Sequence, residues 1–199
     1  MSVQRFVVES LDPKASLAVN AREILKVRIA EFYHYTPIVH DERAGVLLHE
    51  LRIAAKRLRY TLEMFTAVFG TIGDQQIERV KAIQESLGEL HDCDVRIQLI
   101  EDELAELASR QIRELSAMMF EEPIERHKAL TSAALRPPPD DPRRGLLALL
   151  SRQHVARHQH YLTFVELWDA YSADGMRADL VQLSSTPRQP TIQKGSRFV

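Results

Sequence analysis

Turn-forming residues are scarce in this chain, and their scarcity constrains its fold more than any other feature. The 199 residues include seven glycines and nine prolines. Together they make up a smaller share of the chain than the roughly 12% that these two types occupy in an average protein. Few turns leave room only for few, long elements. Apolar residues also recur at three- and four-residue spacing over long stretches, which is typical of helices. The sequence therefore predicts an all-α protein, a bundle of four to six long helices.

Breaks in the apolar repeat divide the chain into predicted helices. A first helix is predicted to begin at Pro13, because proline suits the first position of a helix. It is predicted to end at about Tyr35, because Thr36 precedes Pro37 and a residue before a proline avoids helical dihedral angles. A second is predicted over residues 41–69, and Gly70 ends it. A third pattern runs over 74–119 and fits either one bent helix or two.

The domain organisation predicted from these patterns is simple. We expect one helical domain over residues 1–172, in which a proline-rich linker at 136–142 precedes a closing helix at 143–171. Serine, threonine, proline and glutamine dominate the end of the chain. We expect a flexible tail over residues 173–199.

Several classes of protein are excluded by composition. The single cysteine, Cys93, cannot form an internal disulfide, which fits a reducing compartment. No run of about 18 apolar residues predicts a transmembrane helix, and the N-terminus lacks a signal-peptide pattern. We therefore expect a cytoplasmic protein that does not enter a membrane.

Motifs for catalysis and cofactor binding are missing as well. We find no nucleophile elbow, P-loop or dinucleotide-binding fingerprint. The cluster at residues 91–94 includes His, Cys and Asp but has no second ligand pair at metal-binding spacing. We expect no enzyme activity, no catalytic residue, no metal and no cofactor.

One basic helix face is the most informative local feature. Although the whole chain has a formal net charge of −2, residues 49–60 carry a net +3 and residues 101–125 a net −6. At about 100° per residue, four side chains share an arc of about 80°: His49, Arg52, Lys56 and Arg59. Arg57 sits apart, and the apolar residues lie roughly opposite.

Like charges spaced three or four residues apart destabilise a helix unless something compensates them. Acids on another helix or a bound anion would do so, and arginine and lysine suit phosphate oxygens. An ordinary solvated surface of an amphipathic helix is the alternative interpretation.

Two blocks of the sequence resemble the CHAD family, the conserved-histidine α-helical domain. The first is VLLHELRIAAKRLRY at 46–60, in which a histidine is followed by arginine at +3, a basic residue at +7, arginine at +10 and then tyrosine. The second is KAIQESLGELHDCDV at 81–95, in which Leu-Gly precedes Asp92 by four residues. The resemblance covers residues 14–108, and the closing helix is similar more loosely.

The resemblance implies non-catalytic binding of inorganic polyphosphate, and association with polyphosphate granules. Such domains build two related helical halves around a basic pore or groove, whereas this chain has one signature and is most similar to the second half. Either a C2 homodimer restores the pair, which we favour, or much of the binding surface is lost.

The resemblance also implies roles for single residues. Polyphosphate would be bound by the four residues of the basic helix face, together with Arg57. By its position amid the apolar stripe of the first predicted helix, Arg28 either pairs with an acid such as Asp92 or points into the groove. Lys81 is a secondary ligand candidate. Asp92 would cap a helix or hold an arginine in place, and Tyr60 would have an orienting role.

Other functions remain open on these residues. The chain could be a phosphohydrolase, or an accessory module of a triphosphatase, since CHAD domains can lie beside such catalytic domains. It could also be a helical adaptor whose basic face binds an acidic protein partner. The small basic footprint and the lack of exposed aromatic platforms argue against nucleic acid.

Overall fold

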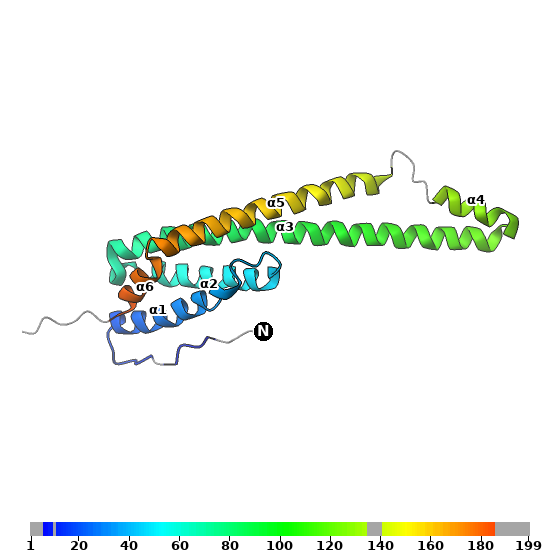
Figure 1. Cartoon of the computed structure of the whole chain (residues 1–199). Helices are drawn as coiled ribbons and strands as arrows, with labels where there is room; N and C mark the ends of the chain where they lie inside the picture. The colour runs from blue at the N-terminus through cyan, green and yellow to red at the C-terminus, as the bar shows by residue number, and fades with distance from the viewer. Residues whose placement is uncertain (1–5, 10, 135–140, 186–199) are drawn as a thin grey trace, which may run out of the picture. The chain divides into compact units, whose positions relative to one another are not determined.

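The structure is a computed structural model that describes residues 6–9, 11–134 and 141–185. Across these ranges it contains helices and no strand, which confirms the predicted all-α fold. The elements, drawn in Figure 1, are α1 (Leu17–Tyr33), the 3-10 turn η1 (Thr36–Ile38), α2 (Gly45–Met64), α3 (Thr66–Glu121), α4 (Ile124–Ala134), α5 (Pro142–Ala173) and α6 (Met176–Ser184).

The chain divides into two compact units. Unit 1 comprises residues 1–84 and 165–199, and unit 2 comprises residues 85–164. The long helices α3 and α5 each contribute to both units. No helix in the described ranges is long and apolar enough to cross a membrane.

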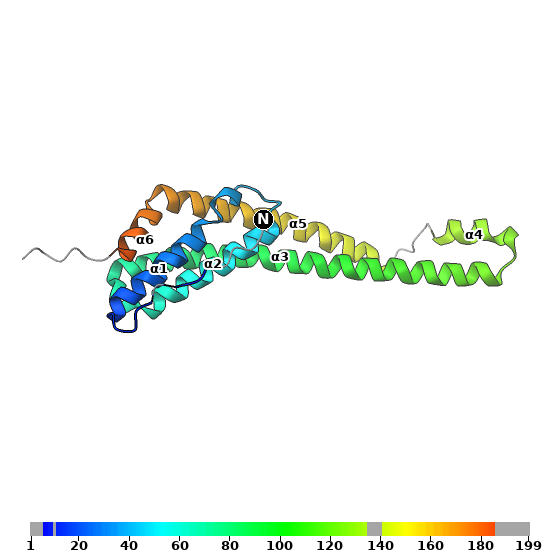
Figure 2. The ribbon, with the colours of Figure 1, turned by 90° about the horizontal axis from the view of Figure 1, so that it is seen from below.

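Helices α1, α2 and α6 form much of unit 1. The Ser16 hydroxyl caps α1 by accepting a hydrogen bond from the backbone N–H of Val19, as serine commonly does at this position. Helix α1 lies against α2 and also against α6 (Figures 1 and 2). In the core of the unit, the fully buried Phe32 ring packs on Trp168, with ring centres 5.2 Å apart.

Gly70 marks the break between the second and third predicted helices. Its φ of 58° and ψ of −155° lie in a region that essentially only glycine adopts. The break predicted at Gly70 is therefore confirmed. Helix α2 ends earlier, at Met64, and a short turn from Thr66 precedes the break.

Beyond Gly70, helix α3 continues to Glu121 without another departure from helical dihedral angles. This settles the choice between one helix and two over residues 74–119 in favour of one, and the helix continues through Gly88. Pro123 follows the end of this helix and precedes α4, so it separates two helices.

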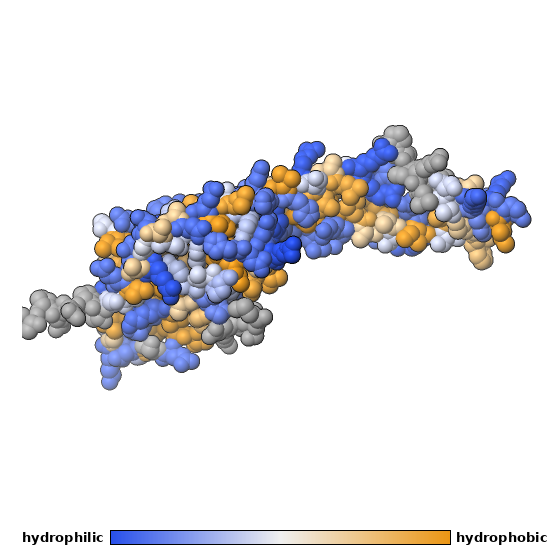
Figure 3. All heavy atoms as spheres, in the orientation of Figure 1, coloured by the Kyte–Doolittle hydropathy of each residue, from blue (hydrophilic) through white to orange (hydrophobic). Residues whose placement is uncertain are grey.

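Unit 2 contains an antiparallel helical hairpin. Its two arms are the parts of α3 and α5 within this unit, which lie side by side in both views (Figures 1 and 2). Arg157 Nε on α5 donates to Asp94 Oδ1 on α3 over 2.5 Å, and Arg143 binds the Gln111 side chain. In Figure 3, hydrophobic side chains also reach the surface along this hairpin.

The closing helix is confirmed, since α5 spans Pro142–Ala173. Residues 135–140 of the predicted linker lie outside the described residues. The predicted tail needs a correction, because α6 occupies Met176–Ser184 and its Leu180 is fully buried. The polar composition begins only after this helix, and residues 186–199 lie outside the described residues.

Candidate anion-binding site

Helix α2 carries the candidate site because its apolar and basic residues fall on different faces. Its buried residues are Leu48, Leu51, Ala54, Ala55, Leu58, Thr61 and Leu62. At about 100° per residue, these side chains form one continuous arc. The basic face, defined as His49, Arg52, Lys56 and Arg59, adjoins that arc. All four residues lie within the helix, so regular helical geometry places them on one face.

The exposure of the basic face is graded. Arg52 and Arg59 flank the buried arc and are only partly exposed, with 17% of the Arg59 side chain accessible. Lys56 is exposed, and His49 is half-buried. The arginine stems thus lie along the protein, while the lysine ammonium reaches water.

The two arginines keep unused hydrogen-bonding capacity. The Nε atoms of Arg52 and Arg59 are buried and have no hydrogen-bond partner. Arg59 Nε lies 3.5 Å from Glu63 Oε1, close enough for an ion pair but too long for a hydrogen bond. Among the residues that the structure describes, Arg52 and Lys56 make no ion pair. A buried donor without a partner costs about 1–3 kcal/mol.

Tyr60 lies at the end of the basic face and contacts two of its cations. The residue is 46% exposed. The centre of the ring is 5.7 Å from Lys56 Nζ and 5.0 Å from Arg59 Cζ. Such cation–π contacts contribute about 0.5–1 kcal/mol at exposed sites. The geometry is compatible with the orienting role expected for this residue.

Arg57 and Arg28 are held by a carboxylate that the sequence reasoning missed. Glu31 on α1 is 4% exposed and accepts from Arg28 Nη1 over 2.7 Å and from Arg57 Nη1 over 2.5 Å. Two cations therefore share one buried anion. The three-residue spacing of Arg28 and Glu31 was visible in the sequence. The contact to Arg57, 26 residues away, was not.

The same cluster acts on a neighbouring phenol. Burial raises the pKa of Tyr35, and the carboxylates of Glu50 and Glu31 raise it further, while Arg57 lowers it. Tyr35 is therefore a neutral phenol at physiological pH.

Lys81 and Asp92 are not part of the basic face. Lys81 on α3 is 42% exposed, and its Nζ lies 3.9 Å from Glu78 Oε2, which is a weak surface pair. Asp92 is an exposed residue of unit 2. It lies inside α3, so it caps no helix, contrary to one of its two expected roles.

The described ranges contain no cluster of metal-binding groups. No three His, Cys, Asp or Glu side chains gather there in a way that could hold a metal ion. The cations of α2 define the candidate site, and guanidinium and ammonium groups are suited to contact anions.

These features define a class of protein: an all-α domain with a partly buried, one-sided cationic helix face. The chain belongs to the CHAD-domain family, whose model matches residues 3–101. The match includes the whole basic face and ends within α3. No curated protein and no solved structure matches the chain.

Proposed function

We propose that the protein binds inorganic polyphosphate through the basic face of α2, without catalysing a reaction. The observation that supports this most strongly is the basic face itself, which gathers four residues on one side of α2 and on which Arg52 and Lys56 make no ion pair with any described residue. The CHAD domain is associated with polyphosphate-related proteins. Phosphate oxygens are the acceptors that guanidinium groups match best.

The spacing of the cations suits a polymer. Neighbours three or four residues apart on a helix are separated by about 5–6 Å, so a chain of repeated charges could contact several of them at once. Each charge-assisted hydrogen bond contributes about 1.5–3 kcal/mol. Several such contacts along one chain would bind tightly, and salt would weaken them steeply, as it does for nucleic acids.

Three further cations have a secondary place in this proposal. Arg57 is 54% exposed on its side chain, so its remaining donors could reach a ligand while Nη1 stays on Glu31. Arg28 is 23% exposed and is held by the same carboxylate. If Lys81 bound a ligand, it would lose only a weak ion pair with Glu78. We propose smaller contributions from these three than from the basic face.

We also propose that the active form is a homodimer. Exposed apolar residues on the hairpin of unit 2 include Leu99, Ile112, Leu147, Val155 and Leu162. Residues 101–125 carry a net charge of −6, whereas residues 142–165 contain four arginines and no acid. A second copy in antiparallel orientation could match acidic with basic segments, as isologous interfaces require. We place this dimer in the cytoplasm, associated with polyphosphate granules.

The binding proposal is tested by a double variant, Arg52→Ala with Arg59→Ala. We expect it to lose at least about tenfold in affinity for long-chain polyphosphate, measured by titration calorimetry at low salt. Arg96→Ala with Arg110→Ala is the matched control, because it removes the same charge from exposed positions on α3. Circular dichroism checks that helicity is unchanged.

Three outcomes would contradict the proposal. Equal loss in both double variants would mean that net charge alone governs binding. Unchanged binding in the first would exclude the basic face. Release of phosphate from polyphosphate in the presence of Mg²⁺ would indicate a phosphohydrolase instead.

The dimer is tested separately by light scattering with size separation. We expect about twice 22.8 kDa for the protein, and half that mass for Leu147→Glu with Val155→Glu. A monomeric parent protein would contradict this part alone.

A further inference from the structure

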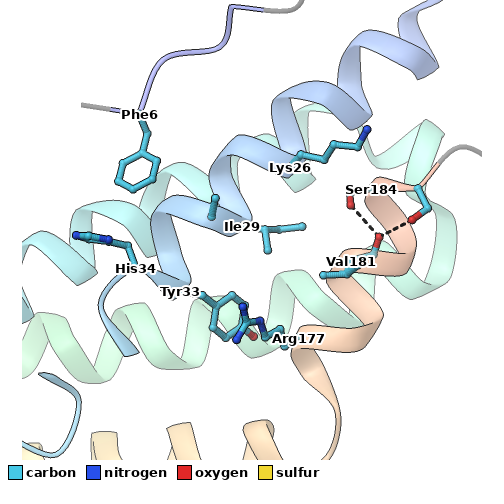
Figure 4. Close-up of a pocket in the computed structure, with 10 residues that line it drawn as sticks. Phe6, Lys26, Ile29, Tyr33, His34, Arg177, Val181 and Ser184 are labelled. Atoms are coloured by element: carbon cyan, nitrogen blue, oxygen red, sulfur yellow. Dashed lines mark hydrogen bonds between the residues drawn. The ribbon is translucent and has the colours of Figure 1, made fainter. Parts of the chain in front are cut away.

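A groove in unit 1 lies between α1 and α6, apart from the basic face. Its volume is about 630 Å³, within the range of small-molecule sites. Figure 4 shows the two helices and the N-terminal segment that surround it. The main lining residues are Lys26, Ile29 and Tyr33 from α1, Arg177 and Val181 from α6, and Phe6. They recur at helical spacing, so each helix presents one face to the groove.

The walls of the groove are apolar and aromatic. Ile29 and Val181 lie on facing walls, and the rings of Phe6 and Tyr33 lie near the end where α1 terminates (Figure 4). Phe6 packs edge-on against His34, with ring centres 5.5 Å apart. These surfaces suit a flat ring, because aromatic pairs gain stability beyond that of the buried area.

The charges around the groove are all of one sign. Among the described residues that line it, Lys26 and Arg177 are cationic and none is a carboxylate. Lys26 Nζ is paired with Glu23 at 2.6 Å, outside the lining. Arg177 has no carboxylate partner in the part of the chain that the structure describes, and its guanidinium carbon lies 4.9 Å from the centre of the Tyr33 ring.

Tyr33 adds a neutral hydroxyl beside this cation. Burial raises its pKa to about 12, although Arg177 and Arg79 act to lower it. The phenol is therefore protonated at neutral pH and can donate a hydrogen bond to an anion. Lys26 lies seven residues before Tyr33, which is about 10 Å along the helix.

We propose that this groove binds a nucleoside phosphate, with the base on the Phe6 ring and the phosphates at Arg177 and the Tyr33 hydroxyl. The aromatic walls account for the base, and the unpaired guanidinium accounts for the phosphate. The site shares no residue with the basic face. The inference therefore does not rest on polyphosphate binding.

ATP is the probe, titrated by calorimetry into the full chain that carries Arg52→Ala and Arg59→Ala. This background removes contributions from the basic face. We expect ATP to bind, and adenosine and tripolyphosphate each to bind at least about tenfold more weakly, because each lacks one half of the recognised chemistry. Binding of tripolyphosphate as tight as that of ATP would overturn the aromatic part of the proposal.

Two variants then locate the site. Arg177→Gln should weaken ATP binding about tenfold, and Ala30→Phe should block the groove without changing a charge. Arg43→Gln is the control, because Arg43 is also exposed and does not line the groove. Unchanged ATP binding in the first two variants, or no binding to the parent protein at millimolar ATP, would overturn the inference.

Discussion

Arg57 on α2 donates through Nη1 to Glu31 Oε1 on α1, over 2.5 Å. The carboxylate is 6% exposed on its side chain and the guanidinium 54%, so a buried acid is held by a cation that remains at the surface. The other oxygen accepts from Arg28 on the same helix, so Glu31 joins the two helices through Oε1 alone while Oε2 is used within α1. The ion pair with Glu31 distinguishes Arg57 from the four residues of the basic face.

Replacing Glu31 with glutamine tests that cluster. Glu31→Gln keeps the size of the side chain but leaves two guanidinium groups without their carboxylate. Breaking a fully buried pair costs about 3–5 kcal/mol. Since Arg57 is half exposed and screened by solvent, we expect about 1–2 kcal/mol in urea unfolding.

Glu23→Gln is the matched control, because it removes a partly exposed partner of Lys26 on the same helix. We expect a loss below about 0.5 kcal/mol there. Glu31→Gln should also keep or raise the affinity for polyphosphate, because two cations lose their anion. Weaker polyphosphate binding by a fully folded Glu31→Gln variant would mean that the cluster around Glu31 positions the basic face.

Gly70 provides a test of backbone conformation. No atom lies within 4 Å of an added Cβ at this position, so Gly70→Ala introduces strain without a clash. We expect about 1–3 kcal/mol of destabilisation, measured by denaturant unfolding. In contrast, Gly145→Ala within α5 should be neutral or stabilise by up to about 1 kcal/mol, since it too meets no atom within 4 Å. Equal effects would refute a special role for the Gly70 backbone.

Leu180 tests whether α6 belongs to the folded core. Its side chain is fully buried, and truncating a buried leucine to alanine costs about 2–5 kcal/mol. We expect a loss in this range for Leu180→Ala and almost none for Gln182→Ala, which changes an exposed residue of the same helix. If Leu180→Ala left the free energy of unfolding unchanged, α6 would not belong to the folded core, in agreement with the flexible tail predicted from composition.

Asp141 makes unfolding of unit 2 sensitive to acid. Hydrogen bonds from the Arg143 side chain lower the pKa of this carboxyl from 3.8 to about 2. A carboxyl whose pKa is lower in the folded state stabilises that state above its unfolded pKa, and the contribution disappears as pH falls through the folded value. The relevant window therefore runs from about pH 4 down to about pH 2.

Thermal unfolding of the parent protein and of Asp141→Asn should thus differ most above pH 4 and converge near pH 2. Asp102→Asn, at an exposed position of α3 in the same unit, is the control. A constant difference between the Asp141→Asn and parent curves across this window would contradict the prediction.

The candidate site was predictable where it depends on one helix. His49, Arg52, Lys56 and Arg59 share a face because a helix turns by about 100° per residue, and α2 includes all four. Their role in binding polyphosphate stays a prediction. Neither Glu31 as a partner for Arg57 nor the groove beside α6 could be predicted in this way, because each joins residues from two different helices.

By itself the sequence determined the local features: the all-α fold, the break at Gly70 and the one-sided charge of α2. Each depends on dihedral preferences or on spacing within a few turns. Only the tertiary structure decided which charges are paired and which donors stay unsatisfied. Those outcomes depend on which helices pack together, since a carboxylate on α1 reaches Arg57 but leaves Arg52 and Arg59 with buried Nε donors that still lack an acceptor.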